Sequence, residues 1–209
     1  MYRRALLLLT AVSFGCNLFA GTITYTRTIG LQPTNWDEQI VIPKYDGALP
    51  LLSVYFALGG DVQADITITN GTEIPNDVTA FASGSLQLTR PDATSILAIF
   101  PYSSSMWSLG PAPDFHIFPT ITASDSTNLT STSAGDLALF SGSGDISLPI
   151  HGIGTSGGSG SGTVNVLAST AARADVTIRY EFDETPEPAA SLLFGSGLVG
   201  LALLLKKRG

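Results

Sequence analysis

The chain has 209 residues, of which 44% are hydrophobic and 13% are charged, and its formal net charge at pH 7 is −7. Half of the ten basic residues stand at the two ends, so the stretch from Gly21 to Thr185 holds five basic against sixteen acidic residues, a net charge of 5 − 16 = −11. Nucleic acids and anionic lipids repel such a surface, which argues against both as partners, and an acidic polysaccharide would need a bridging cation. An acidic surface that keeps an exported protein soluble is the simpler interpretation.

The first 20 residues have the layout of a secretory signal peptide. Arg3 and Arg4 precede an apolar run at 5–12, and the small residue Ala20 closes the segment. We therefore predict export across the inner membrane, with cleavage between Ala20 and Gly21.

Cys16, the single cysteine of the chain, lies inside this segment and raises an alternative, a lipoprotein-type cleavage that attaches lipid to Cys16. That pathway prefers a Leu-like residue three positions earlier, where this chain has Ser13. Cleavage after Ala20 instead leaves a mature domain without cysteine, and therefore without disulfide or thiolate chemistry.

Residues 21–184 are enough for one domain with a sizeable core, and their pattern is that of β-strands. Val62, Ala64, Ile66 and Ile68 alternate with polar residues, as expected of a half-buried strand. Similar runs predict further strands at 22–28, 53–58, 85–89, 95–100, 115–117, 137–140, 146–150, 163–167 and 174–182.

Turn signals and prolines complete the fold prediction. Gly59-Gly60-Asp61, Asn70-Gly71 and Pro75-Asn76-Asp77 follow predicted strands, as in antiparallel pairs with short connections. Ten prolines between Pro33 and Pro149 disfavour long helices, and Pro149 should place its own strand at a sheet edge or a bulge. We expect an all-β, extracytoplasmic antiparallel β-sandwich of about nine to eleven strands.

A set of short motifs frames this domain. Trp36-Asp37 leads to Ile40-Val41-Ile42-Pro43, and Val176-Thr177-Ile178-Arg179-Tyr180-Glu181-Phe182 closes the domain just before the tail. In these motifs the chain resembles the choice-of-anchor E family of exported bacterial domains, although Leu49-Pro50 stands where that family usually has Gly. The resemblance implies a surface β-domain that different proteins carry on different anchors, and it transfers no catalytic residue.

Gly154-Thr155-Ser156-Gly157-Gly158 matches the G-x-S-x-G pattern of serine hydrolases. In those enzymes the serine occupies a sharp turn between a strand and a helix, and no helix is predicted here. Eight of the 21 residues from Gly142 to Gly162 are glycine, so composition explains the match better. We predict a mobile hairpin loop for this stretch.

Histidines and acids give little support to a metal centre or a catalytic pair. His116 lies between two apolar residues and should point away from the core, and His151 should end the strand at 146–150. A metal site would need both to converge with a carboxylate such as Asp114. Asp37 and Glu38 are adjacent, so in a strand they face opposite sides of the sheet. We predict no catalytic residue, metal or cofactor, with one calcium bridged by loop carboxylates as the alternative.

Trp107 and Tyr102 are the candidate ligand contacts. With Met106 they lie in a Ser-rich, Pro-flanked connection, where aromatic rings can form a platform on which sugars stack. The alternative, which we favour, is that Trp107 plugs the end of the sandwich. Residues 120–133 are rich in Ser and Thr and are predicted either to accept O-linked sugar or to form a solvated loop.

Residues 185–209 form a tail that sets the predicted topology. Pro186, Glu187 and Pro188 precede 17 uncharged, mainly apolar residues, and Lys206, Lys207 and Arg208 follow as a basic stop-transfer cluster. A helix of that length reaches about 25 Å, enough for a thin bilayer, and its basic end stays cytoplasmic. The predicted membrane anchor includes Ala189, Leu192, Leu193, Leu198, Val199, Leu201, Leu203, Leu204 and Leu205.

This tail resembles the PEP-CTERM sorting signal of bacteria that produce extracellular polysaccharide. The resemblance implies that an exosortase, a membrane-embedded cysteine-dependent protease, cuts near Pro186-Glu187-Pro188 and releases or re-anchors the domain. The inner membrane would then be a transient partner. Both prolines keep this segment extended, as a protease substrate must be.

Two functions of different classes fit these features. The preferred one is a non-enzymatic surface or extracellular matrix protein linked to the envelope, to biofilm or to exopolysaccharide. The alternative is an exported polysaccharide hydrolase, whose pair of carboxylates would be brought together only by the fold.

Overall fold

The computed structural model describes residues 20–183, and Thr22–Phe182 forms one compact unit within that range. Residues 1–19 of the predicted signal peptide lie outside the described residues, as do the tripeptide, the apolar anchor and the basic cluster within 184–209. Across residues 20–183, no helix has the length and apolar character needed to cross a bilayer.

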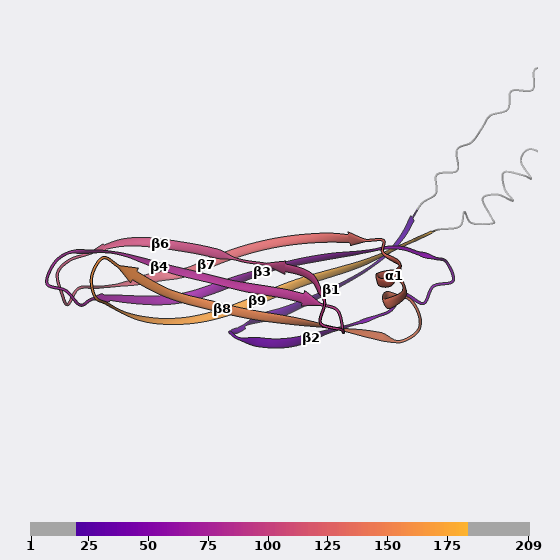
Figure 1. Ribbon diagram of the computed structural model, residues 1–209, viewed down its shortest axis with the longest axis horizontal. Coiled ribbons are helices and arrows are strands. Elements are labelled where there is room, and N and C mark those ends of the chain that lie inside the picture. Colours follow the sequence, from indigo (N-terminus) through magenta and orange to yellow (C-terminus); the bar gives the residue numbers. More distant parts are fainter. Residues whose placement is uncertain (1–19, 184–209) are drawn as a thin grey trace, which may run out of the picture. The chain divides into compact units, whose positions relative to one another are not determined.

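Two antiparallel β-sheets make up the compact unit, which confirms the all-β prediction (Figure 1). Sheet A has the strand order β1-β9-β3-β7, and sheet B has the order β2-β8-β4-β5, with β6 also paired to β4. The described elements are β1 (Ala20–Pro33), β2 (Trp36–Pro43), β3 (Leu51–Asn70), β4 (Asn76–Thr89), β5 (Ser95–Ile99), β6 (Tyr102–Leu109), β7 (Phe115–Ser131), α1 (Ala134–Phe140), β8 (Asp145–Gly160) and β9 (Val164–Asp183). Inward side chains of both sheets form one hydrophobic core.

Strands β3 and β9 each run for 20 residues, so the turn predicted at Gly59-Gly60-Asp61 is wrong. Gly60 lies opposite Ala174 in the β3–β9 ladder. A Cβ atom at Gly60 would overlap the side chain of Leu86 in sheet B, so this glycine makes room for the facing sheet and does not reverse the chain. The loop at Asn70-Gly71, by contrast, does follow the end of β3 as predicted.

The glycine-rich stretch predicted as a mobile loop is strand β8, which lies between β2 and β4 inside sheet B. Its inward positions change from large residues such as Leu148 to glycines such as Gly152 and Gly158. A Cβ atom at Gly152 would overlap the indole of Trp36, and one at Gly158 would overlap the side chain of Ile68 from sheet A. Close approach of neighbouring side chains therefore explains the glycines.

Pro149 lies in this interior strand, and its predicted place at an edge or bulge is wrong. The β4–β8 ladder ends at the pair Leu88 and Ile150, one residue before Pro149 is reached. The missing N–H of Pro149 therefore removes no bond from that ladder. Its carbonyl oxygen accepts a hydrogen bond from Thr89 Oγ1 at 3.2 Å.

Two Ser-rich segments that were predicted as connections are strands. Tyr102–Leu109 is β6, paired with β4, and the Ser/Thr-rich segment after residue 120 continues β7 as far as Ser131. Both strands have one unpaired edge in the described part of the chain. At such edges polar residues cost little, so the period-two apolar signal is weak.

The four residues at 137–140, predicted as a strand, belong to helix α1. Ser133 is the N-cap, and its Oγ accepts a hydrogen bond from the backbone N–H of Asp136 at 3.2 Å. Phe140 at the end of the helix is fully buried, with its ring 5.2 Å from that of Phe56. The helix thus covers the core where the chain passes from sheet A to sheet B.

An aromatic cluster fills the core near this helix. The ring of Tyr180 packs edge-on against Tyr25 and Tyr45, at centroid distances of 5.7 and 6.2 Å. Its hydroxyl donates to the carbonyl oxygen of Pro43 at 2.9 Å, and burial raises the pKa of Tyr180. A neutral, hydrogen-bonded hydroxyl is thereby kept inside the core.

Candidate functional site

Trp107 lies where β6 of sheet B meets β7 of sheet A. Its indole stacks on the imidazole of His116, with ring centroids 4.0 Å apart and an interplanar angle of 7°. His116 in turn packs edge-on against Phe118 at 4.7 Å. Trp107 remains 51% exposed, so it covers the edge of the core without filling the core.

His116 is on the core-facing side of β7, so the prediction that it points away from the core is wrong. It pairs in register with the fully buried Ile68, and the neighbouring Phe115 and Ile117 are the exposed residues. In this segment the apolar side chains face solvent and the polar His116 faces inward, where the Trp107 ring covers its imidazole.

Tyr102 lies on the other side of β6. Trp107 pairs with the buried Val78, whereas Tyr102 pairs with Ser83 and is 66% exposed on the outer side of sheet B. Residues five apart in a strand face opposite sides of the sheet. The structure therefore separates the two candidate contacts: Trp107 belongs to the edge of the core and Tyr102 to the outer surface.

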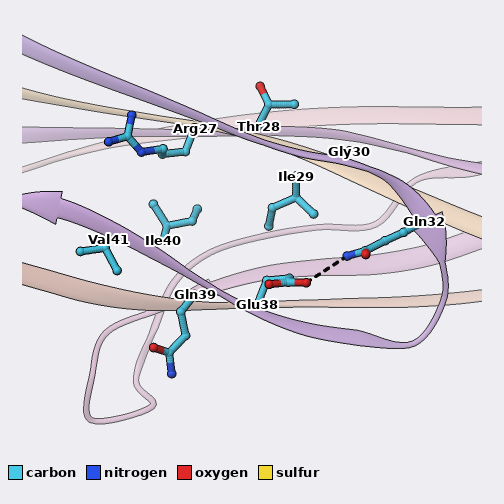
Figure 2. A pocket seen from close by; sticks show the side chains of 9 residues that line it. All are labelled: Arg27, Thr28, Ile29, Gly30, Gln32, Glu38, Gln39, Ile40 and Val41. Atoms are coloured by element: carbon cyan, nitrogen blue, oxygen red, sulfur yellow. Dashed lines mark hydrogen bonds between the residues drawn. The ribbon is translucent and has the colours of Figure 1, made fainter.

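A groove of about 470 Å³ lies between β1 and β2, the edge strands of sheets A and B (Figure 2). The side chains of Ile29 and Ile40 lie in the space between the two strands, and Gln32 Nε2 donates to Glu38 Oε1 at 3.4 Å (Figure 2). Arg27 lines the same groove and donates to its neighbour's carbonyl oxygen. Of the four arginines between residues 20 and 183, Arg27 is the one without a carboxylate in ion-pair distance among the described residues.

Arg27 and Glu38 have a structural role at these edges. Each shares a side of its strand with core residues, Arg27 with Tyr25 and Ile29, and Glu38 with Ile40. Inward-pointing charges at an edge strand hinder pairing with another chain. These charges thus protect the edge strands β1 and β2, which border the groove, against pairing with a strand of another chain.

Three hollows of the described residues each have a single carboxylate in their lining. The β1–β2 groove contains Glu38, a second hollow beside Leu31 contains Asp65, and a third beside Trp107 contains Asp77, each as the one acid among its described lining residues. Glycoside hydrolysis requires two carboxyl groups that flank the scissile bond. None of these three hollows supplies such a pair.

His151 lies within β8 and not at its end, and it contacts Asp37 across the β2–β8 ladder. His151 Nδ1 and Asp37 Oδ1 are 2.5 Å apart, and the Asp37 side chain is 82% exposed. Asp37 and Glu38 face opposite sides of β2, as predicted. Within the described part of the chain, no three His, Cys, Asp or Glu side chains group closely enough to hold a metal ion.

Ser156, the serine of the G-x-S-x-G match, lies inside β8 and is followed by more strand. Its Oγ and the Oγ1 of Thr170 form a hydrogen bond of 2.6 Å. A nucleophile elbow needs a turn into a helix. The geometry at Ser156 is instead that of an ordinary paired strand.

The predicted processing sites lie at or beyond the limits of the described residues. Strand β1 begins at Ala20, so the predicted signal-peptide cleavage before Gly21 falls at the start of that strand. Strand β9 ends at Asp183, and only Glu184 and Thr185 stand between it and Pro186 in the sequence. The tripeptide, the anchor residues and the basic cluster lie outside the described range.

No protein-family model and no curated protein matches the sequence. Among solved structures, the chain is similar to a chain in the structure of infectious bursal disease virus, Gx strain, at 12% identity over 86% of this chain and a TM-score of 0.27. It is also similar to the T13 particle of that virus, at 13% identity over 81% of this chain and a TM-score of 0.24. The chain spans 42% and 41% of those two chains. Similarity at such TM-scores supports no conclusion about this chain.

Proposed function

We propose that this chain is an exported, exosortase-sorted surface or extracellular matrix protein without enzymatic activity. Its β-domain would act at the envelope, in biofilm or with exopolysaccharide. The proposal joins the predicted signal peptide, the Pro186-Glu187-Pro188 tail and the two-sheet domain into one route from export to display.

The relation between β1 and β9 carries this proposal. Thr26 bonds to Thr177 and Thr28 bonds to Asp175, so the two strands are antiparallel neighbours. The start of β1 and the end of β9 therefore lie at the same end of sheet A. A domain whose chain enters and leaves at one end can be held there by its tail while its other surfaces stay free.

Deleting the exosortase gene in the producing bacterium tests the sorting route. The expected result is a mature protein that lacks residues 1–20 and is cut near the tripeptide in the wild-type strain. In the deletion strain, mass spectrometry and fractionation should find the uncut tail in the inner membrane. Unchanged processing in that strain would refute the proposal.

Paired substitutions localise the signal. Glu187→Gln alters the tripeptide, and Glu184→Gln makes the same chemical change three residues earlier. We expect Glu187→Gln to accumulate unprocessed protein and Glu184→Gln to behave like the wild type. Release of new reducing ends from the strain's own polysaccharide by the purified chain would contradict the non-enzymatic part.

A further inference from the structure

The outer side of sheet B has one uncharged surface, which we call the hydroxyl face. It consists of the twelve outward positions of three neighbouring strands: 79–85 of β4, 102–108 of β6 and 153–159 of β8, taking every second residue. Seven of the twelve are Ser or Thr. The other five are Phe81, Tyr102, Met106, Ile153 and Gly157.

Strand registers place the apolar residues of this face next to one another. Phe81 pairs with Ser104 on one side and with Gly157 on the other, and Tyr102 and Met106 are the diagonal neighbours of Phe81 on β6. The Phe81 ring lies over Gly157, where a Cβ atom would approach it to 3.2 Å. Tyr102 and Met106 are 66% and 70% exposed. The result is a low apolar strip bordered by hydroxyl groups.

Charged side chains on the outer side of sheet B border the hydroxyl face and do not lie within it: Asp77 pairs with Ser108 at one end, and the Asp37–His151 ion pair lies beyond Ile153. The outer side of sheet A carries the ion pair of Arg173 with Asp61 and that of Arg179 with Glu181. The hydroxyl face carries no charged residue at any of its twelve positions, although the domain has a net charge of 5 − 16 = −11. A surface this depleted of charge in an acidic domain favours an uncharged partner.

We propose that the hydroxyl face binds an uncharged polysaccharide chain, which deepens the function proposed above and rests on it for the physiological setting. The C–H faces of sugar rings would lie on Phe81, Tyr102 and Met106, as apolar surfaces do on aromatic rings. Sugar hydroxyls would exchange hydrogen bonds with the surrounding Ser and Thr side chains, each of which both donates and accepts. An anionic polymer would meet a negative domain with no cation on this face.

A protein partner fits this face less well than a polysaccharide. The buried cores of protein–protein interfaces are enriched in aromatic residues and Arg and depleted in Ser. Here Ser and Thr are the majority, and Arg is absent from the twelve positions. Hydroxyl groups that a dry protein interface would leave unpaired find partners on a sugar polymer.

One end of the face offers a stronger acceptor. A hollow of about 420 Å³ there is lined by Asp77, Met106, Trp107 and Ser108. The Asp77 carboxylate accepts a hydrogen bond from Ser108 Oγ at 2.5 Å and is exposed. Its other lone pairs are available to hydroxyl groups of a sugar that lies across Met106.

Binding is tested with the full chain, purified in a zwitterionic detergent that has no sugar headgroup. Probes are three uncharged polysaccharides, namely swollen cellulose, a β-1,3-glucan and a galactomannan, with alginate as the anionic comparison. The test variant is Tyr102→Ser/Met106→Ser. The matched control is Ile117→Ser/Leu167→Ser, which removes two side chains of 65% and 76% exposure from the outer side of sheet A.

The expected result is retention on at least one uncharged polysaccharide and none on alginate. The test variant should bind roughly tenfold more weakly, the loss expected for removing an aromatic contact, while the control binds like the wild type. Circular dichroism of both variants checks that they fold.

Three outcomes would overturn the inference: binding to none of the uncharged polysaccharides, equal loss in the test and control variants, or self-association through this face in light scattering. Each outcome is independent of the exosortase experiment, because binding is measured on the purified chain. If the protein is sorted by the exosortase but binds no polysaccharide, the proposed sorting route is supported and the proposed ligand is wrong.

Discussion

Arg90 binds Asp136 through both carboxylate oxygens, with Nε–Oδ1 and Nη2–Oδ2 distances of 2.7 and 2.9 Å. The bond joins the end of β4 to the first turn of α1, 46 residues later in the sequence. Ser131 Oγ donates to the same carboxylate at 2.6 Å. The side chain of Asp136 is 6% exposed and that of Arg90 is 22% exposed, so a partly buried ion pair holds the helix on the core.

Asp136→Asn should destabilise the domain strongly. Removing the charge leaves the half-buried Arg90 without its ionic partner, and the loss of hydrogen bonding to a charged group costs about 1.5–3 kcal/mol of unfolding free energy. Urea unfolding followed by circular dichroism measures it. Asp37→Asn is the matched control, because Asp37 is 82% exposed in its pair with His151 and should change stability by less than about 0.5 kcal/mol. Equal effects of the two substitutions would contradict this account.

Acid should also lower the folding stability of the domain, because it protonates Asp136. The hydrogen bond from Arg90 is the main cause that holds the pKa of Asp136 below its usual range. Because the pKa of Asp136 is lower in the folded state, its ionised carboxylate contributes fully to the unfolding free energy above the unfolded-state pKa of about 3.9. This contribution is lost as the pH falls through the folded-state pKa. Thermal melts of the wild type and Asp136→Asn should therefore differ most near neutral pH and converge in acid. A difference independent of pH would show that the charge is not responsible.

Gly158→Val should be poorly tolerated. Its side chain would enter the space of Ile68, and overpacking of a filled core costs about 1–3 kcal/mol or more. Gly30→Val makes the same change in β1, where nothing lies within 4 Å of the new Cβ, and should be close to neutral. Chemical unfolding of both variants compares them. A neutral Gly158→Val would mean that β8 is glycine-rich for another reason.

The Trp107–His116 stack should give a measurable coupling energy. A double-mutant cycle with Trp107→Ala and His116→Ala should yield about 0.5–1.5 kcal/mol, the usual value for a stacked aromatic pair. The same cycle with Trp107→Ala and Leu31→Ala should be additive, since Leu31 lies on β1 at the other edge of sheet A. Coupling in the second cycle as large as in the first would argue against a specific stack.

The fold class followed from the sequence because period-two alternation is a local property. Val62 to Ile68 and Ala174 to Phe182 alternate clearly, and both lie in the predicted strands. The full length of the strands was not predictable in the same way. Gly60 and Gly158 lie in glycine-rich sequence that is typical of turns. Their places in strands are explained by side chains of the opposite sheet, Leu86 against Gly60 and Ile68 against Gly158.

The candidate site shows the same limit. The sequence named Tyr102 and Trp107 together as candidate contacts, and the pairing of β6 with β4 was needed to separate Tyr102 from Trp107 and to place it beside Phe81. Alternation of Tyr102, Ser104, Met106 and Ser108 was a usable signal for an outward face. Short helices are harder: α1 depends on the cap at Ser133 and on Arg90, which is remote in sequence.

Strand β9, the last described element before the tail, is an interior strand of sheet A. It lies between β1 and β3, and its ladder with β3 extends from the Leu51–Phe182 pair to the Asn70–Val164 pair. Tension applied along the chain beyond Asp183 would therefore be shared in shear by two hydrogen-bonded ladders at once. An edge strand in that position would peel away bond by bond. Pulling at the exit of sheet A thus loads an interior strand that is paired on both sides.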